Sequence, residues 1–517
     1  MGKRFFIAFL LVLPFCLSEG QDKAASILDP AAHEMNFERH LWFSTDNAAG
    51  MALSPLDNYS VVSAGYRHTE GDFRSLQRGK SENLLTFNTN GAVSLGRTFL
   101  WGDFTFRRDG WQDAQYNTNC FFLDPDMPYY VADDRAGDWT RQSYDMSVKA
   151  AFPMLWDRVV FGAGASYLAY KGAKQIDPRG VPIGYALEVS PSVAVIIGEG
   201  HAIGAVFTYR NMFERSTFSN VQGSNSSPVF LMKGLGFYSS GSVSGTGGIS
   251  PYFYPGNSFG GSLQYAFSSG DVQVLADLGF YSYRRDAFQN PQTRYRMGTA
   301  GKTGCSADFM VMWGSGVRHK LSLEALYTVT KGTEYLQERD QDVNTDPYKV
   351  LAELDMSRYR TRRASVTYGI FTGGRDNTYS WYAGVQAGYE GRSETYFTPE
   401  SVLEYNNAGA ALFAKKNFRA GKTCRILVAA DAGYRLNLGG EYDYNGPDPD
   451  HRVITVFYAN EFAVSSADFF KAGLDAVFSV PVRSVAGINI GASFDGMFPT
   501  AGGGSRWAVS GILSVLF

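Results

Sequence analysis

The sequence predicts an all-β protein, an antiparallel transmembrane β-barrel of the outer-membrane type with about 18 strands. Three observations predict this fold class: long segments in which apolar and polar residues alternate, connections that alternate between tight turns and long loops, and a terminal segment that is apolar on one face. Alternation with a period of two is the pattern of a strand whose two faces meet different surroundings. A strand that faces lipid must be paired on both edges, which a closed barrel achieves.

The terminal segment, 506–517, shows the alternation most clearly and ends on an aromatic residue. Arg506, Ser510 and Ser514 belong to one set of alternate positions. A half-buried strand of a soluble domain would show the same pattern, so the prediction depends on the other segments as well. The set that would face lipid comprises Trp507, Val509, Gly511, Leu513, Val515 and Phe517.

Eighteen segments meet the criterion of alternation, and their connections follow a regular order. Tight connections such as 96–97 and 269–270 alternate without a break with longer ones such as 111–137 and 439–466. Outer-membrane barrels have short turns in the periplasm and long loops outside, so this order predicts that both termini are periplasmic. A count of 16 stays open if the first hairpin is misread. The predicted strands are 58–72, 82–95, 98–110, 138–153, 158–173, 182–196, 201–215, 256–268, 271–287, 300–313, 319–337, 357–372, 378–395, 402–417, 422–438, 467–481, 484–498 and 505–517.

The composition fits one large barrel and argues against nucleic acid as a partner. The 517 residues include 47 Lys and Arg against 50 Asp and Glu, so the chain has no basic surplus for binding a polyanion. Its 38 Phe, 31 Tyr and 57 Gly residues are typical of strands that carry aromatic side chains and bend.

Residues 1–20 have the features of a cleavable export signal. Lys3 and Arg4 precede an apolar run, 5–17, and cleavage is expected after Gly20. No later stretch approaches about 18 consecutive apolar residues, so helical membrane spans are not expected. We therefore expect an exported protein that resides in the cell outer membrane.

Residues 21–57 lack strand alternation and form an N-terminal leader before the barrel domain, 58–517. Pro30 and the helical spacing of Met35 and Phe37 predict a short helix. The leader is long enough to fill part of a barrel as a plug, and a disordered periplasmic tail fits the same residues. Both interpretations stay open at this point.

Charged residues occupy the strand face opposite to the apolar one. An Arg or Lys side chain that faces lipid near the middle of the bilayer costs roughly 2–4 kcal/mol, so these residues are predicted by their alternate positions to line the lumen. Two compatible roles fit them: they orient polar solutes, or they pair across strands and stiffen the wall. The predicted lumen residues are Asp145, Lys149, Glu188, Arg210, Asp277, Arg285, Glu324, Glu390, Arg392, Asp431, Arg435 and Asp475.

The connection 216–255 is unusually apolar for a loop. An exposed apolar segment of this length would be unfavourable in water, so it is predicted to fold into the barrel mouth or to contact a partner. The candidate mouth residues are Phe230, Met232, Tyr252 and Phe253.

Four arginines, Arg358, Arg360, Arg362 and Arg363, stand at the predicted outer end of one strand. Their spacing places three of them on one face. They fit the phosphates of lipid A or an anionic solute, and they also fit a solvated strand extension.

No motif predicts catalysis, a metal site or a cofactor. The chain after the signal has three widely spaced cysteines, Cys120, Cys305 and Cys424, which fit neither a disulfide framework nor a thiolate metal site. His33 and His40 are seven residues apart, and this spacing matches no stringent metal motif. No nucleophile is assembled with a base and no Gly-rich phosphate loop follows a strand. We therefore expect a protein that is not an enzyme.

The export signal, the leader that ends in Asn47-Ala48-Ala49-Gly50-Met51, the alternating strands and the terminal Phe517 resemble an uncharacterised family of Gram-negative outer-membrane β-barrel proteins. The five-residue stretch also looks like the Asn-Pro-Ala-Gly-Leu motif that precedes the first strand in the long-chain fatty-acid transporter superfamily, with Ala48 in place of the proline. The larger strand count departs from those transporters, so their ligand is not carried over. The resemblance implies outer-membrane lipid and lipopolysaccharide as surroundings, and recognition of the C-terminal strand by the barrel-assembly machinery.

These features predict a channel or gated transporter for small polar or amphipathic solutes, with selectivity set by the lumen charges and the connection 216–255. The alternative is a barrel that does not transport and acts as a surface receptor, a secretion-system component or a structural scaffold. The sequence names no solute and does not determine the oligomeric state.

Overall fold

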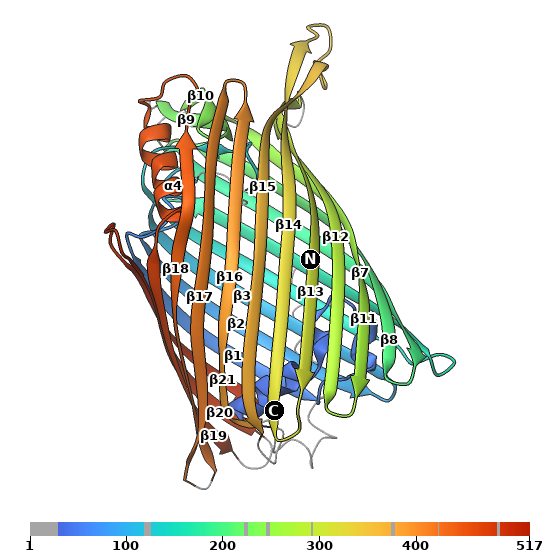
Figure 1. The fold of residues 1–517 in the computed structure, drawn as a ribbon. Helices are drawn as coiled ribbons and strands as arrows, with labels where there is room; N and C mark the ends of the chain where they lie inside the picture. The colour runs from blue at the N-terminus through green and yellow to red at the C-terminus, as the bar shows by residue number, and fades with distance from the viewer. Residues whose placement is uncertain are drawn as a thin grey trace.

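The computed structural model describes residues 29–117, 126–221, 226–244, 249–290, 293–373, 378–421, 423–482 and 486–517. Within these residues eighteen antiparallel strands form one closed barrel (Figure 1). Each strand pairs with its neighbours in sequence, and β1 (Tyr59–Gly71) pairs with β21 (Arg506–Leu516) to close the sheet. The predicted fold class is therefore confirmed. The predicted signal, 1–20, the start of the leader, 21–28, and Cys120 lie outside the described residues.

The barrel strands occur where alternation predicts them, and several extend further toward the long connections. β15, for example, begins at Tyr348 rather than near 357, because its hairpin with the preceding strand continues to pair beyond the predicted loop boundary. The remaining barrel strands are β2 (Ser81–Leu95), β3 (Thr98–Ala114), β5 (Gly137–Ala151), β6 (Val159–Lys174), β7 (Arg179–Gly198), β8 (His201–Ser219), β11 (Ile249–Ser269), β12 (Val272–Gln289), β13 (Tyr295–Trp313), β14 (Val317–Arg339), β15 (Tyr348–Gly373), β16 (Tyr379–Phe397), β17 (Glu400–Ala420), β18 (Cys424–Asp443), β19 (Phe469–Val482) and β20 (Ala486–Pro499).

The outer face of the wall is apolar along most strands. Leu263, Leu278 and Leu412 are each more than 60% exposed, on three different strands. Exposed large apolar side chains at alternate positions form the lipid-facing band of an outer-membrane barrel. A row of neighbouring aromatic rings on this face comprises Tyr167, Tyr185, Phe213, Phe253 and Phe288. Such rings favour the boundary between lipid and water.

The wall is taller on one side than on the other. β14 and β15 have 23 and 26 residues, whereas β21 and β1 have 11 and 13. The hairpin of β14 and β15 therefore rises above the rest of the barrel at the end with the long connections (Figure 1).

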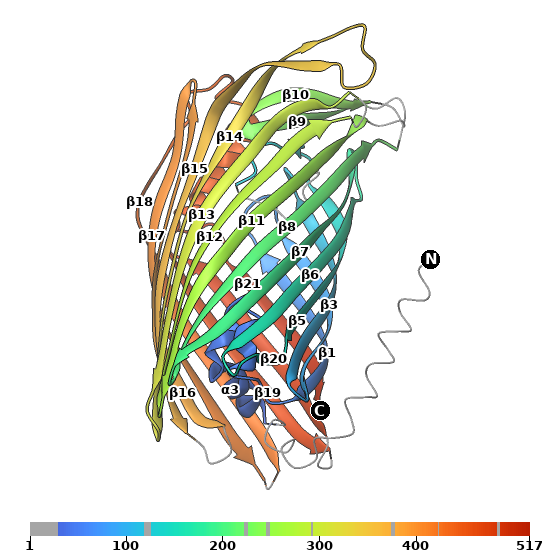
Figure 2. The same cartoon turned by 90° about the vertical axis from the view of Figure 1, so that its right-hand side faces the viewer.

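The N-terminal segment lies inside the barrel at the end with the tight turns (Figure 2). It contains α3 (Pro30–Glu38) and two 3-10 helices, η2 (Leu41–Ser44) and η3 (Ala49–Ala52). α3 begins where the sequence predicts, since Asp29 Oδ1 accepts a hydrogen bond from the Ala31 amide and Pro30 occupies the first turn. No described helix is long and apolar enough to cross a bilayer.

At the opposite end, several long connections fold into the barrel mouth. β4 (Val131–Ala132), β9 (Ser226–Gly234) and β10 (Phe237–Ser244) form a separate three-stranded sheet. A π-helix, η4 (Val453–Tyr458), continues into α4 (Ala459–Ser465). The predicted loop 216–255 is too long at both ends. β8 continues to Ser219, and β11 already begins at Ile249. These extensions pair with each other, which satisfies their backbone hydrogen bonds.

Candidate functional site

The middle of the barrel contains two adjoining cavities. One has a volume of about 620 Å³ and lies against the wall from β13 to β19. The other has a volume of about 630 Å³, lies against β7, β8, β11, β12 and β13, and reaches Thr45 and Asp46 of the N-terminal segment. Both are lined by Ser306 and Asp308, so they form one internal space, which we call the chamber.

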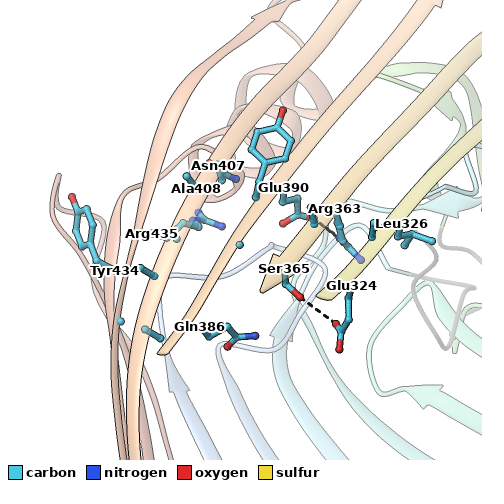
Figure 3. Close-up of a pocket in the computed structure, with 18 of the residues that line it drawn as sticks. Glu324, Leu326, Arg363, Ser365, Gln386, Glu390, Asn407, Ala408, Tyr434 and Arg435 are labelled. Carbon is cyan, nitrogen blue, oxygen red and sulfur yellow. Dashed lines mark hydrogen bonds and ion pairs between the residues drawn. The ribbon is translucent and has the colours of Figure 1, made fainter. Parts of the chain in front are cut away.

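One part of the chamber wall has almost no side chains. Ser365, Gly388 and Gly409 lie directly opposite one another on β15, β16 and β17 and leave a shallow recess. Charged groups border it: Arg363 donates two hydrogen bonds to Glu390, at 2.7 and 2.9 Å, and the Ser365 hydroxyl donates to Glu324 at 3.2 Å (Figure 3). A solute in this recess would contact backbone and be surrounded by paired charges.

A row of three carboxylates makes another part of the wall negative. Asp277, Asp308 and Glu324 are directly opposite one another on β12, β13 and β14. None of the three forms an ion pair with a described residue. Asp277 accepts a hydrogen bond from Gln264 Nε2 at 3.0 Å, and Glu324 accepts one from the Ser365 hydroxyl at 3.2 Å. Like charges in neighbouring strands repel each other, so this row favours cations in the chamber.

The tight-turn end of the chamber is covered by residues 29–57, which we call the plug. Ion pairs join the plug to the inner wall: Glu34 to Lys415 at 2.8 Å, Asp29 to Arg425 at 3.5 Å, and Glu38 to Lys320. These side chains are partly exposed. The plug also packs through Ala49 and Met51 against apolar wall residues, among them Leu516.

Asn47 is the most deeply anchored residue of the plug and is completely buried. Its Nδ2 donates to Gln264 Oε1 at 2.8 Å and to the Val193 carbonyl at 3.0 Å, while its Oδ1 accepts from the Gly50 amide at 3.2 Å. Gly50 must lack a side chain, because a Cβ there would lie 2.0 Å from the Trp42 ring. The five-residue stretch that carries the family resemblance therefore forms a buried part of the contact between plug and wall.

The two histidines of the plug have structural roles. His40 Nδ1 lies 2.7 Å from the Ser54 hydroxyl, and burial lowers the pKa of His40 to about 4. Burial also lowers the pKa of His33, whose ring packs against Phe37 and Tyr59. Among the residues that the structure describes, no group of three His, Cys, Asp or Glu side chains is placed to hold a metal ion.

The opposite end is covered by β4, β9, β10, η4 and α4, which we call the cap. Phe230 and Met232 are buried in its apolar cluster, together with Leu235 at the hairpin tip. Phe237 stacks on the wall residue Tyr396 with ring centroids 3.8 Å apart. The cap therefore has a packed apolar core that is continuous with the barrel wall.

Buried ion pairs tie the cap and its neighbouring loop to the wall. Lys174 Nζ donates to both carboxylate oxygens of Asp133, at 2.7 and 2.8 Å, and the two side chains are only 1% and 0% exposed. Asp126 pairs with Arg392 at 2.8 Å and with Lys302 at 2.5 Å. Burial opposes the ionisation of Asp126, but these two cations lower its pKa below the ordinary value.

Glu461 of α4 has no cation at hydrogen-bonding distance among the described residues. The Ser75 hydroxyl donates to Glu461 Oε1 at 2.5 Å. Burial raises the pKa of Glu461 to about 7, so the carboxyl gains and loses its proton near neutral pH.

The predicted lumen residues all lie on inner-face positions, but they are used in different ways. Several pair across strands: Asp145 with Arg107, Arg285 with Glu214, and Asp431 with Lys471, at 3.6–3.9 Å. Glu188 lies opposite Arg210 and both line the chamber. Asp277, Glu324 and Asp475 have no ion-pair partner among the residues that the structure describes.

Three predicted lumen residues hold the two closures in place. The Lys149 ammonium donates to the Thr45 carbonyl of the plug at 2.8 Å. Arg392 binds Asp126 beneath the cap, and Arg435 donates to the carbonyls of Val464, in the last turn of α4, and Ala467, just after it. These contacts give Lys149, Arg392 and Arg435 a structural role, which is one of the two compatible roles predicted for the lumen charges.

The four predicted mouth residues do not all lie in the mouth. Phe230 and Met232 are in the cap, and Tyr252 is buried below it beside Phe218. Phe253 lies on the outer face of β11, in the aromatic row with Phe213 and Phe288, so its assignment to the mouth is wrong. The reason is that consecutive strand residues point to opposite faces.

Sequence reasoning missed Asp126, Asp133 and Lys174. Nothing near Asp133 marks it as buried, because its partner is 41 positions away in the chain. Asp126 stands in a loop whose contacts come from β13 and β16. Only the approach of distant segments brings these charges together.

A closed antiparallel barrel with an apolar outer face and a polar interior defines the class of outer-membrane β-barrel proteins. Within this class, the chain belongs to the family of unknown function DUF6850, whose model matches residues 48–517. No curated protein matches the chain.

Several solved outer-membrane proteins are similar to it at low identity. The outer membrane transporter YddB from Escherichia coli is 7% identical over 89% of this chain and 80% of its own, with a TM-score of 0.40. The ferric-catecholate import receptor Fiu from E. coli K12 is 9% identical over 89% and 81%, with a TM-score of 0.39. OpdK from Pseudomonas aeruginosa, solved with vanillate, is 10% identical over 89% and 98%, with a TM-score of 0.35. No ligand is carried over from these structures.

Proposed function

We propose that this protein is an outer-membrane channel or gated transporter that receives small polar or amphipathic solutes in its chamber and is closed at both ends in the present state. The observation that carries the proposal is a hollow, charged chamber between two separate closures. Cavities of roughly 300–1,000 Å³ are the usual size of small-molecule sites. A barrel that served only as a scaffold would have no need for this space.

We infer the orientation in the membrane from the lengths of the connections. Outer-membrane barrels have tight turns in the periplasm, so the plug and both ends of the barrel domain face the periplasm and the cap faces outward. A solute from outside would pass the cap first, enter the chamber, and leave when the plug moves. The signal at 1–20 would direct export to this membrane.

Planar-bilayer conductance tests the proposal, because two closures in series must both be opened for current to flow. We would compare the intact chain, a variant lacking residues 29–56, a variant in which residues 222–248 and 446–466 of the cap are each replaced by a short linker, and the combination of both changes. Each single variant should conduct little more than the intact chain. The combined variant should show frequent open steps.

A matched control shortens a hairpin that does not belong to the cap. Replacing residues 340–347, between β14 and β15, in the variant that lacks the plug should leave the conductance low. If the combined plug and cap variant conducts no better than the intact chain, the barrel is an occluded scaffold or receptor and the proposal fails.

The open variant also reveals which charges select the solute. Replacing the carboxylate row by Asp277→Asn, Asp308→Asn and Glu324→Gln should shift the reversal potential in a salt gradient toward anions. Substituting Asp145 instead should have a smaller effect, because Arg107 already pairs with that carboxylate at 3.9 Å.

A further inference from the structure

Three of the four arginines singled out in the sequence lie on the outer surface of the barrel. Arg358, Arg360 and Arg362 occupy alternate positions of β15, and we call them the arginine row. The residues between them point inward: Tyr359 is buried, and the Thr361 hydroxyl accepts a hydrogen bond from Arg392. Arginine side chains at three successive outward positions therefore face the membrane side of the wall.

The arginine row begins where the apolar band of the wall ends. Arg362 is directly opposite Tyr327 of β14. On the other side, the Tyr389 hydroxyl of β16 donates a hydrogen bond to Asn406 at 2.6 Å. Tyrosines with the ring in the apolar band and the hydroxyl at its edge mark the boundary between lipid and water. Farther along the same strands, toward the tight turns, Val366 and Val385 are exposed and apolar. The arginine row therefore stands at the level of lipid headgroups.

The charges of the arginine row are not balanced by the wall. No described residue forms an ion pair with any of the three, and Arg358 only lies over the Phe397 ring at 5.3 Å. Lys331, directly opposite Arg358, adds a fourth positive charge, and its contact with Asp355 is 3.8 Å long and about half exposed. By contrast Arg363, the next residue on the inner face, is paired with Glu390.

Clustered like charges are unfavourable unless an anion comes from outside. Lys331 and Arg358 are direct cross-strand neighbours, an arrangement that destabilises a sheet. The nearest outward carboxylate across β16 is Glu404, two strands away, and it accepts a hydrogen bond from Asn406. Guanidinium groups bind phosphate with two parallel hydrogen bonds, which makes a phosphate-bearing lipid the matching partner.

We infer that the arginine row binds the phosphate groups of lipid A in the outer leaflet. The three side chains span roughly 13 Å along the strand, which is enough for more than one phosphate. The site is at the end with the long connections, so the inference rests on the orientation proposed above. It does not depend on transport, and lipid binding in detergent can be measured independently of conductance.

Native mass spectrometry of the purified chain in detergent tests the inference with lipid A that carries both phosphates and with the same lipid after dephosphorylation. The intact chain should retain the phosphorylated lipid and not the dephosphorylated one. The variant R358Q/R360Q/R362Q should bind it at least on the order of tenfold more weakly, as expected when hydrogen bonds to charged groups are lost. The control R284Q removes an outward arginine that already has a partner, Asp286 at 3.3 Å, and should bind normally.

Three outcomes would overturn the inference: unchanged binding by the triple variant, equal retention of dephosphorylated lipid A, or displacement of lipid A by an equal amount of phosphatidylglycerol. Folding is checked by the shift in gel mobility between unheated and heated samples. If the triple variant fails to fold, the single variant R362Q and the charge-conserving R358K/R360K/R362K replace it. R362Q should weaken lipid A binding. The lysine variant keeps the charges but loses the paired hydrogen bonds, so it should bind lipid A more weakly than the intact chain; unchanged binding in both variants contradicts the proposed site.

Discussion

The two closures of the chamber are built in different ways. The plug is one continuous stretch, and its ion pairs with the wall, such as Glu34 with Lys415, are partly exposed. The cap is assembled from several connections that are each attached to strands at both ends, and its tie to the wall includes the fully buried pair of Asp133 and Lys174. The two regions therefore differ in how much their interactions depend on solvent.

This difference indicates which closure can move. Exposed ion pairs typically contribute less than about 1 kcal/mol each and weaken with salt. Removing one partner of a buried pair costs roughly 3–5 kcal/mol. We therefore expect the plug to leave its position more readily than the cap, which would make the plug the movable closure of the barrel.

The largest effect is expected from breaking the buried pair of the cap. Lys174→Met leaves the Asp133 carboxylate buried without its cation and should reduce the local stability of the cap by about 3–5 kcal/mol. Hydrogen exchange of residues 226–244 measures this loss. Lys171→Met, at an exposed position of the same strand, is the control and should change it by less than about 0.5 kcal/mol.

A second substitution should make that loss smaller. The double variant D133L/K174M removes both charges, so it should be more stable than K174M alone. Normal protection of the cap in K174M would mean that the cap does not depend on buried charge, and the contrast with the plug would disappear.

The next largest effect concerns the deepest anchor of the plug. Asn47→Ala leaves the buried Gln264 amide and Val193 carbonyl without their donor and should weaken the plug by about 1–3 kcal/mol. Exchange of residues 30–44 should accelerate while the cap stays protected. Asn58→Ala is the control, because Asn58 accepts only one hydrogen bond, at an exposed position. Equal exchange in the two variants would contradict the role of Asn47.

Acidification should change the local stability of the two closures in opposite directions. The pKa of Glu461 is raised to about 7 in the folded cap, so the cap gains stability as pH falls through 7 and loses it as pH rises. The pKa of His40 is lowered from 6.5 to about 4 in the folded plug, so the plug loses stability as pH falls below 6.5.

The local free energy of unfolding of the cap and that of the plug should each change by roughly 1–2 kcal/mol between neutral pH and about pH 5. Protection factors of the cap and plug amides, corrected for intrinsic exchange, report the two trends separately. Glu461→Gln should reduce the pH dependence of protection in the cap only. His40→Asn should reduce the pH dependence of protection in the plug only. Parallel trends in the two regions would refute the assignment.

The smallest effect is the response to salt. Raising the ionic strength from about 0.1 M to about 1 M screens the exposed pairs of Asp29, Glu34 and Glu38, and should weaken the plug by about 1 kcal/mol in total. The buried pairs of the cap should not respond. A salt effect on the cap as large as that on the plug would show that the two closures are held alike.

The sequence by itself determined the barrel. Alternation is a local property of a strand, so the inward and outward positions of β12, β19 and β20 can be read from neighbouring residues alone. The same rule predicts that three of the four arginines share one face and that charged residues such as Asp277 point into the lumen. The helix that begins at Pro30 has a local signal as well.

Only the tertiary structure decided how the lumen is closed. The plug is held by residues of β7, β11, β14 and β17, and the cap by partners such as Asp133 and Lys174, which are 41 positions apart. These contacts have no periodic pattern in the chain, because they form between segments that meet only after the sheet has closed. Alternation predicts a hollow cylinder, and the packing of distant segments determines the chamber inside it.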